Sequence, residues 1–238
     1  MKTIASLAKF LLERNKEIAK MHHLQTQEIV KNIYVIKTKD ANFYIIKNDE
    51  EYIAIDAGGG GENIAKAQLE KLNIEPEKIT AVFLTHTDFD HISALGLFKN
   101  ATIYVSKQEE QILDGTVPRM FGMKNRLKHA YNTIDSDEEI FFGAMKIKPI
   151  LTPGHTTGSM SYLLNNKYLF VGDALRLKDG QVSLFNSLFN MDDEIHKQSL
   201  KQLAKIQHAE YIFTAHYGFS NNYEAAFENF RAPAGGNL

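Results

Sequence analysis

Residues 79–91, ITAVFLTHTDFDH, decide the fold and the chemistry expected of the rest of the chain. The segment 79–84 is largely apolar or β-branched, a pattern typical of a fully buried strand. The residues that follow it include four side chains that can bind a metal ion: His86, Asp88, Asp90 and His91. We therefore predict a buried strand that ends at a metal-binding loop.

The composition excludes several kinds of site. The chain has 238 residues, 44% of them apolar, which is enough to build the core of one domain. It has no cysteine, so a metal could be held only by His, Asp, Glu or backbone groups. The formal net charge of −2 gives no general attraction to nucleic acid or to anionic membranes, and neither is expected as a partner.

Residues 1–26 are predicted to carry an amphipathic helix ahead of a single domain over residues 27–238. Its apolar face would consist of Leu7, Phe10, Leu11 and Ile18. Charged residues interrupt the apolar stretch and no small-residue cleavage site follows, which argues against a secretory signal. We expect a cytoplasmic protein whose N-terminal helix packs on the body or on a second copy in a homodimer. Attachment to a membrane surface is the less favoured alternative.

Strands and helices alternate in both halves of the chain. Strands are predicted at residues 28–37, 42–47, 51–56, 79–84, 102–105, 145–151, 160–164, 167–171 and 210–214. Helices are predicted at residues 62–73, 91–98 and 192–206, with one further short helix between residues 106 and 143. This alternation predicts an α/β fold, a four-layer αββα sandwich in which two mixed sheets lie face to face with helices outside. The strand order stays open.

Three more candidate ligands follow apolar strands in the same way. His155 follows KIKPILTPG, Asp173 follows YLFVG, and His216 follows YIFTA. Loops at strand ends place functional groups on a rigid scaffold while leaving them free to face a cleft. Because one ion could not easily use so many ligands, the crowding favours two ions.

The segments THTDFDH, LTPGHTTGS, VGDAL and TAHYG together resemble the signature of the metallo-β-lactamase superfamily. The resemblance runs from Asp56 to His216 and implies the αββα fold and a centre of two metal ions. It implies a first ion held by His86, Asp88 and His155. It implies a second ion held by Asp90, His91 and His216, with Asp173 between the two. Asp56 would orient a ligand rather than bind a metal.

The sequence departs from the family motif HxHxDH at one position, where Asp88 replaces the second histidine. A carboxylate makes the site more negative and harder, so zinc is the first choice but iron or manganese is also compatible. The flavodiiron branch of the family also has a carboxylate here, which keeps a diiron redox protein as an alternative. Asp88 could instead form a salt bridge with a neighbour and leave one site weak or empty, as in a non-catalytic binding protein.

The resemblance implies hydrolysis by a metal-bridged hydroxide, with Asp90 orienting it or accepting its proton. The first choice of substrate is a small ester, lactone or thioester, which could be anionic, and a phosphodiester comes second. Tyr217 is a candidate for protonating the leaving group.

Residues 118–132 are a possible lid or insertion, because segment 118–129 is basic. The segment could be a solvated loop, or its cations, Arg119 and Arg126 among them, could bind an anionic substrate beside the metals. The remaining histidines are expected to be surface or structural residues: His22, His23, His129, His196 and His208.

Overall fold

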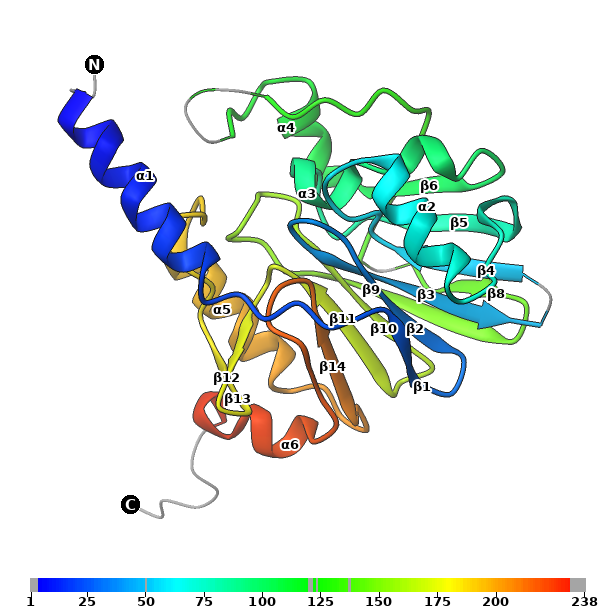
Figure 1. The fold of residues 1–238 in the computed structure, drawn as a ribbon. Coiled ribbons are helices and arrows are strands. Elements are labelled where there is room, and N and C mark those ends of the chain that lie inside the picture. Colours follow the sequence, from blue (N-terminus) through cyan, green and yellow to red (C-terminus); the bar gives the residue numbers. More distant parts are fainter. Residues whose placement is uncertain (1–3, 50, 120–121, 123, 137, 232–238) are drawn as a thin grey trace, which may run out of the picture.

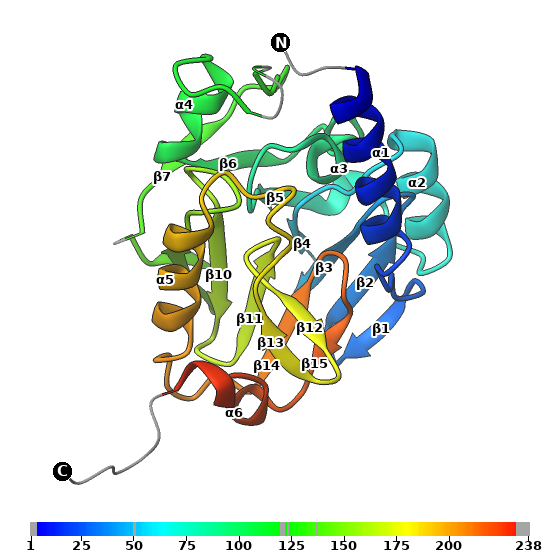
Figure 2. The ribbon, with the colours of Figure 1, turned by 90° about the vertical axis from the view of Figure 1, so that its left-hand side faces the viewer.

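The computed structural model describes residues 4–49, 51–119, 122, 124–136 and 138–231. Two sheets lie face to face, and helices cover their outer surfaces, α2 (Glu62–Glu70) on one side and α5 (Asp193–Leu203) on the other (Figure 1). The predicted αββα sandwich is thereby confirmed. Figure 2 shows the same arrangement in a second view, with α5 and α2 at opposite sides of the sheets.

The first sheet comes from the N-terminal half. Its strands in spatial order are β1 (Gln27–Val30), β2 (Ile33–Lys37), β3 (Asn42–Asn48), β4 (Glu51–Ile55), β5 (Ile79–Phe83), β6 (Thr102–Ser106) and β7 (Asn132–Ile134). The strands from β1 to β4 pair antiparallel, and those from β4 to β7 pair parallel. The central strand β5 is buried along most of its length, as its apolar sequence predicts.

The second sheet comes from the C-terminal half. Its strands in spatial order are β15 (Phe219–Ser220), β14 (Tyr211–Thr214), β11 (Tyr168–Gly172), β10 (Met160–Leu164), β9 (Met145–Leu151) and β8 (Ile140–Phe142). Only β11 and β14 pair parallel, with α5 in the connection between them. A hairpin of β12 (Arg176–Lys178) and β13 (Gln181–Ser183) lies apart from both sheets.

Aromatic and branched side chains fill the space between the sheets. Phe170 stacks on Phe213 with ring centroids 4.6 Å apart, and Tyr44 from the opposite sheet meets Phe170 edge-on at 5.2 Å. Each such side chain contributes about 1.5–3 kcal/mol by leaving water. The Tyr44 hydroxyl donates to the carbonyl of Thr214 at 2.6 Å, and the Tyr162 hydroxyl donates to Leu84 at 2.7 Å. These bonds fix one sheet against the other next to two of the strand ends that carry candidate ligands.

Each outer layer buries its own apolar face. Ala65 and Leu69 of α2 pack on the first sheet, and Leu200 and Leu203 of α5 pack on the second. The other helices are short: α3 (Phe89–Ile92), α4 (Glu110–Leu113) and α6 (Tyr223–Ala226), with 3₁₀ turns at Pro76–Lys78, Leu95–Leu97, Lys107–Glu109 and Glu228–Phe230. Asp192 begins α5 by accepting a hydrogen bond from the backbone of Ile195 at 2.9 Å.

Some predicted elements differ from the structure. The single strand predicted at 28–37 is wrong, because Asn32 adopts a left-handed conformation (φ 67°) and turns the chain into the β1–β2 hairpin. The helix predicted at 91–98 is shorter and broken, with α3 followed by a 3₁₀ turn. The prediction missed β7, β8, β12, β13, β15 and α6. These elements are two to four residues long and too short to show a hydrophobic period.

Helix α1 (Ile4–Ile18) extends away from the two sheets (Figure 1). Leu11, Leu12 and Ile18 are exposed on it. Its C-terminal part approaches the body, where Arg176 lies 3.9 Å from the carboxylate of Glu17. The packing of the apolar face of α1 on the body or on a second copy stays a prediction. Within the described ranges, no helix combines the length and the apolar character needed to cross a membrane.

Candidate metal centre

All seven predicted ligands meet at one place between the two sheets. His86, Asp88, Asp90 and His91 follow β5 of the first sheet, and Asp88 immediately precedes α3, which carries the last two. His155, Asp173 and His216 follow β9, β11 and β14 of the second sheet. The loops after a parallel pair such as β11 and β14 emerge at the same edge of a sheet, which brings Asp173 and His216 together.

One group of ligands consists of His86, Asp88 and His155. Nε2 of His155 lies 3.3 Å from Oδ2 of Asp88, and Nε2 of His86 lies 3.7 Å from the same oxygen. The three ligand atoms lie within 4.8 Å of one another, close enough to share an ion. We call this group the first subsite.

A second group consists of Asp90, His91 and His216. Nε2 of His216 lies 3.4 Å from Oδ2 of Asp90, and Nε2 of His91 lies 3.8 Å from it. These atoms also lie within 4.8 Å of one another. We call this group the second subsite.

Asp173 lies between the two subsites and faces both with different oxygens. Its Oδ1 is 3.2 Å from Nε2 of His216 and 3.5 Å from Nε2 of His91, both in the second subsite. Its Oδ2 is 3.5 Å from Nε2 of His155 in the first. This carboxylate therefore faces both subsites, and its role as a bridge between two ions stays a prediction.

The four histidines share one orientation. Each has Nδ1 within hydrogen-bond distance of a group outside the centre, at 2.8–3.4 Å: His86 with Thr85, His91 with Asp56, His155 with Asn190 and His216 with His23. Each Nε2 therefore faces the carboxylates. Nε2 of His86, Nε2 of His91 and Oδ1 of Asp173 are buried and have no hydrogen-bond partner among the described residues. Buried polar atoms are rarely left unpaired, so this donor set fits a bound cation.

The charges of the centre are strongly coupled. Burial alone would raise the pKa of Asp173, but His216 and His91 outweigh it and hold this pKa well below its usual value. Burial alone would lower the pKa of His91, but Asp173, Asp56 and Asp90 raise it well above its usual value. The pKa of His216 is raised in the same way, mainly by Asp173. In the absence of a metal, protons on the histidines balance the carboxylates, and a cation would replace them.

Asp56 supports the centre without lining it. Its Oδ1 accepts a hydrogen bond from the backbone N–H of Thr85 at 2.7 Å, and its Oδ2 accepts from the Thr85 hydroxyl at 2.8 Å and from Nδ1 of His91 at 2.8 Å. Asp56 itself is held in a left-handed conformation, with φ 64°. The carboxylate thus orients a ligand, which is the role that the resemblance implied for it.

Glu109 is a supporting residue that the sequence analysis missed. It is fully buried, and its two carboxylate oxygens accept hydrogen bonds from both halves of the protein. Oε1 accepts from the backbone and hydroxyl of Thr87 at 2.9 and 2.8 Å. Oε2 accepts from the Thr156 hydroxyl at 2.7 Å and from the backbone of Gly158 at 3.2 Å. Glu109 thereby connects the loop after β5 to the loop after β9. Glu109 lies in a segment without a clear helix or strand pattern, so the sequence gave no indication of its role.

His23 was expected to be a surface or structural residue, but it lies beside the centre and contacts a candidate ligand. Its Nε2 is 3.3 Å from Nδ1 of His216, and burial lowers its pKa, which keeps the ring neutral. His196 is a structural residue, as expected, with Nε2 bonded to the carbonyl of Ala174 and Nδ1 2.8 Å from Asn190. Because Asn190 also contacts His155, His196 supports that ligand indirectly. The sequence around His23 gave no way to distinguish this residue from its exposed neighbour His22.

Segment 118–129 contacts the first subsite directly. Arg119 is buried and donates to both oxygens of Asp88, from Nε to Oδ1 at 2.9 Å and from Nη2 to Oδ2 at 2.6 Å. Asn125 donates to Oδ1 of Asp88 at 2.8 Å. The interpretation of this segment as a solvated loop is therefore wrong for Arg119, whereas it holds for Arg126, which is exposed. The apolar residues Met120, Phe121 and Met123 of this segment lie outside the described residues.

The centre opens into a cavity of about 540 Å³. Its lining includes the cations of Arg14 and Lys39 and the rings of Phe89, Phe185 and Phe189. Tyr217 does not occur among the described residues that line this cavity, so the structure does not support it as a proton donor. The cavity combines an apolar wall with a few charges, as is usual for a small-molecule site.

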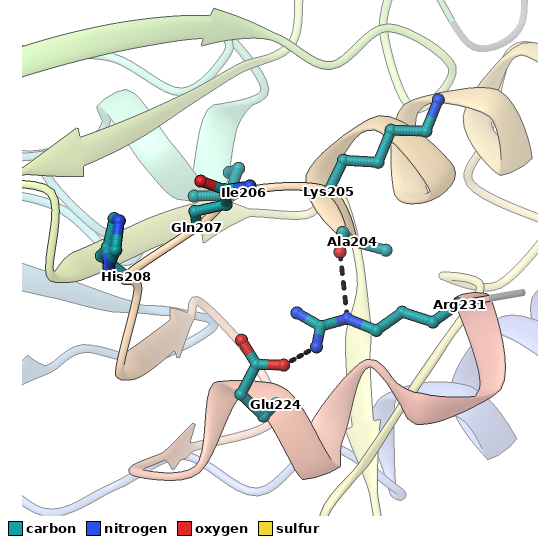
Figure 3. Close-up of a pocket in the computed structure, with 7 residues that line it drawn as sticks. All are labelled: Ala204, Lys205, Ile206, Gln207, His208, Glu224 and Arg231. Carbon is teal, nitrogen blue, oxygen red and sulfur yellow. Dashed lines mark hydrogen bonds and ion pairs between the residues drawn. The ribbon is translucent and has the colours of Figure 1, made fainter. Parts of the chain in front are cut away.

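A second cavity, of about 440 Å³, lies between the end of α5 and α6 (Figure 3). None of the seven predicted ligands lines it. Its guanidinium, from Arg231, already pairs with Glu224 and donates to the carbonyl of Ala204 at 3.1 Å. This cavity therefore offers no converging group that would carry out chemistry.

Known proteins resemble the chain in sequence. A sequence model of the metallo-beta-lactamase superfamily matches residues 37–216. A probable metallo-hydrolase of Methanocaldococcus jannaschii is 33% identical over 157 residues, 66% of this chain and 66% of the relative. A hydroxyacylglutathione hydrolase of Bartonella tribocorum is 30% identical over 192 residues, 76% of this chain and 65% of the relative. The chain thus spans just under two thirds of the length of these curated relatives.

Solved structures resemble the chain in fold. A beta-lactamase from Chitinophaga pinensis has a TM-score of 0.68 and 21% identity, covering 87% of this chain and 89% of that one. An archaeal metallo-beta-lactamase superfamily protein from Sulfolobus tokodaii has a TM-score of 0.60 and 20% identity, covering 86% and 91%. The sequence match over residues 37–216, together with this fold, shows that the chain is a member of the metallo-beta-lactamase superfamily.

Proposed function

We propose that the protein is a metal-dependent hydrolase that acts on a small ester, lactone or thioester, with a thioester as the first choice. The observation that carries this proposal is the common orientation of the four histidines. Each uses Nδ1 outside the centre and directs Nε2 toward one or two of the carboxylates of Asp88, Asp90 and Asp173. In a histidine with only a structural role, a buried ring nitrogen normally has a hydrogen-bond partner, whereas Nε2 of His86 and Nε2 of His91 have none among the described residues.

The two subsites would hold two divalent ions, with Asp173 between them. Zinc is the first choice because four imidazoles contribute, and iron or manganese is compatible with the carboxylates. When bound, such ions lower the pKa of water to about 7 and polarise the oxygen of the bond that is cleaved.

Asp90 is the residue best placed to move a proton. Its side chain is 31% exposed, against 20% for Asp88 and 6% for Asp173. It also lines the cavity. A carboxylate oxygen of Asp90 would orient the attacking water, accept its proton and release that proton to solvent, while Asp173 stays fixed by His91 and His216.

Two features support a thioester. A thiol has a pKa of about 8.5, so it leaves more readily without a proton donor than an alcohol does. In addition, the relative from Bartonella tribocorum is named for the hydrolysis of an acyl group carried on glutathione. The cations of Arg14 and Lys39 at the cavity fit an anionic substrate, and the three phenylalanine rings fit an apolar acyl group.

The test compares metal-free protein with protein reconstituted with zinc, manganese or iron on four substrates: S-lactoylglutathione, p-nitrophenyl acetate, a γ-lactone and bis-p-nitrophenyl phosphate. We expect metal-dependent turnover, highest on the thioester, and a loss of about 100-fold or more for Asp90→Asn. Highest turnover on the phosphodiester would overturn the substrate class. Oxygen consumption by the iron form without hydrolysis would replace the hydrolase with a diiron redox protein.

A further inference from the structure

The guanidinium of Arg119 lies inside the first subsite. Its side chain is 4% exposed. Nη2 is 2.6 Å from Oδ2 of Asp88 and 3.1 Å from Nε2 of His155, while these two ligand atoms are 3.3 Å from each other. One nitrogen of Arg119 therefore contacts two of the three atoms that would hold the first ion.

Arg119 uses the same lone pair that a metal would use. A guanidinium only donates hydrogen bonds, so Nε2 of His155 must be the acceptor in this contact. An imidazole nitrogen has one lone pair, and a ligating nitrogen gives that pair to the ion. His155 can thus bind Arg119 or a metal at Nε2, but not both.

The second subsite has no such occupant. Nε2 of His91 and Oδ1 of Asp173 are buried without a hydrogen-bond partner in the described part of the chain. In the first subsite, Nε2 of His86 is likewise without a partner, but Arg119 holds the other two ligand atoms. The structure thus places a cation of its own on two of the three ligands of the first subsite and none on the second. The two subsites differ although their ligands are similar in kind.

The unusual residue at position 88 explains the difference. A carboxylate matches the forked geometry of a guanidinium, and Nε and Nη2 of Arg119 reach Oδ1 and Oδ2 of Asp88 as two parallel bonds. The histidine that the family motif has at this position could not accept such a pair. Asn125, from the same segment as Arg119, adds a third bond to the carboxylate.

We propose that Arg119 occupies the first subsite as a resident cation, so that the second subsite fills first and the first subsite binds an ion only when Arg119 is displaced. This inference rests on the proposed metal-dependent function. An ion that enters the first subsite must break a partly buried, bidentate ion pair, which is costly. The wild-type protein should therefore bind one ion at least tenfold more tightly than the other.

The test is a metal titration that does not depend on turnover. Metal-free protein is titrated with Zn²⁺ against a chromophoric chelator, and the metal retained after desalting is measured by elemental analysis. We expect about one tightly held equivalent in the wild type. Arg119→Gln should raise the affinity of the weaker site at least tenfold and retain about two equivalents. Arg126→Gln, in an exposed residue of the same segment, should behave as the wild type.

A second variant covers the case in which Arg119→Gln leaves Asp88 unpaired and fails to fold. Asp88→His combined with Arg119→Gln restores the histidine of the family motif and removes the resident cation, so it should also retain two equivalents. Two equally tight sites in the wild type, or no change in either variant, would overturn the inference but leave the metal-dependent function standing. If neither the wild type nor any variant binds Zn²⁺, Mn²⁺ or Fe²⁺, the proposed function fails as well.

Discussion

The hydroxyl of Thr156 donates a hydrogen bond of 2.7 Å to the carboxylate of Glu109, and this bond joins the two halves of the protein beside the metal centre. Thr156 follows the ligand His155 in the C-terminal half, and Glu109 follows β6 in the N-terminal half. Because Glu109 also binds Thr87, between His86 and Asp88, one buried carboxylate fixes the spacing of ligands from two loops.

Replacing Glu109 by Gln should therefore weaken both the fold and the first subsite. The amide keeps one acceptor, but its NH₂ group would face the N–H of Gly158, which leaves a buried donor unpaired. Such a group costs about 1–3 kcal/mol. Urea unfolding of the metal-free protein should show this loss. The neighbouring variant Glu110→Gln, at a partly buried position, should not, and equal stability of the two variants would contradict the role of Glu109.

Replacing Asp56 by Asn should weaken metal binding more than it changes the fold. The amide can still accept one bond from Thr85, but it cannot also accept from both the Thr85 hydroxyl and Nδ1 of His91. Loss of such an orienting partner typically costs 10–100-fold in metal affinity. Chelator competition should show this decrease.

The matched control for that change is Asp179→Asn. Asp179 also adopts a left-handed conformation, with φ 52° against 64° for Asp56, but it is exposed in a turn. An equal effect of the two substitutions on metal affinity would show that backbone conformation, not the contact with His91, is responsible.

His23 and His22 give a test in two adjacent residues. Of the two side chains, only that of His23 contacts a candidate ligand, at Nδ1 of His216. His22 bonds to the carbonyl of His216 through its backbone N–H, which an alanine at position 22 would keep. His23→Ala should lower the affinity of the second subsite about tenfold or more. His22→Ala, at an exposed position, should leave it unchanged. A loss that is the same in both variants would mean that His23 does not act through His216.

The metal-free protein should lose stability as the pH rises above about 6.5. The pKa values of His91 and His216 are raised above 6.5 by the surrounding carboxylates, so the protons on these rings stabilise the fold fully below that value. This contribution is lost as the pH rises through the raised pKa values. Metal ions compete with the same protons, so the increase in Tm on adding Zn²⁺ should grow with pH. Melting curves from pH 6 to pH 9 with and without zinc would check this, and a zinc effect that is constant or falls with pH would contradict it.

Much of the centre could be predicted from the sequence because strand ends can be recognised locally. An apolar strand precedes His86, His155, Asp173 and His216, and each such strand predicts a rigid position from which a ligand can project. The convergence of these residues followed from the resemblance and from the expectation that two sheets would face each other. The structure brings all seven side chains together, and their role as metal ligands stays a prediction.

The residues that were missed act across the fold. Glu109 and His23 lie far in sequence from the residues they contact, Thr156 and His216. The contact of Arg119 with Asp88 spans 31 residues and depends on how the chain folds back over α3. A basic run by itself predicts solvation, and the sequence indicated only that Asp88 could form a salt bridge with a neighbour, not that its partner would come from this segment.

The most direct test of the central claim is the metal content and the thioester hydrolysis of the same protein sample, measured before and after treatment with a chelator. We expect the purified protein to carry at least one equivalent of a divalent metal. We also expect turnover of S-lactoylglutathione to fall with the metal on chelation and to return when Zn²⁺ is restored. Hydrolysis that persists undiminished in protein shown by elemental analysis to be free of metal would contradict the central claim.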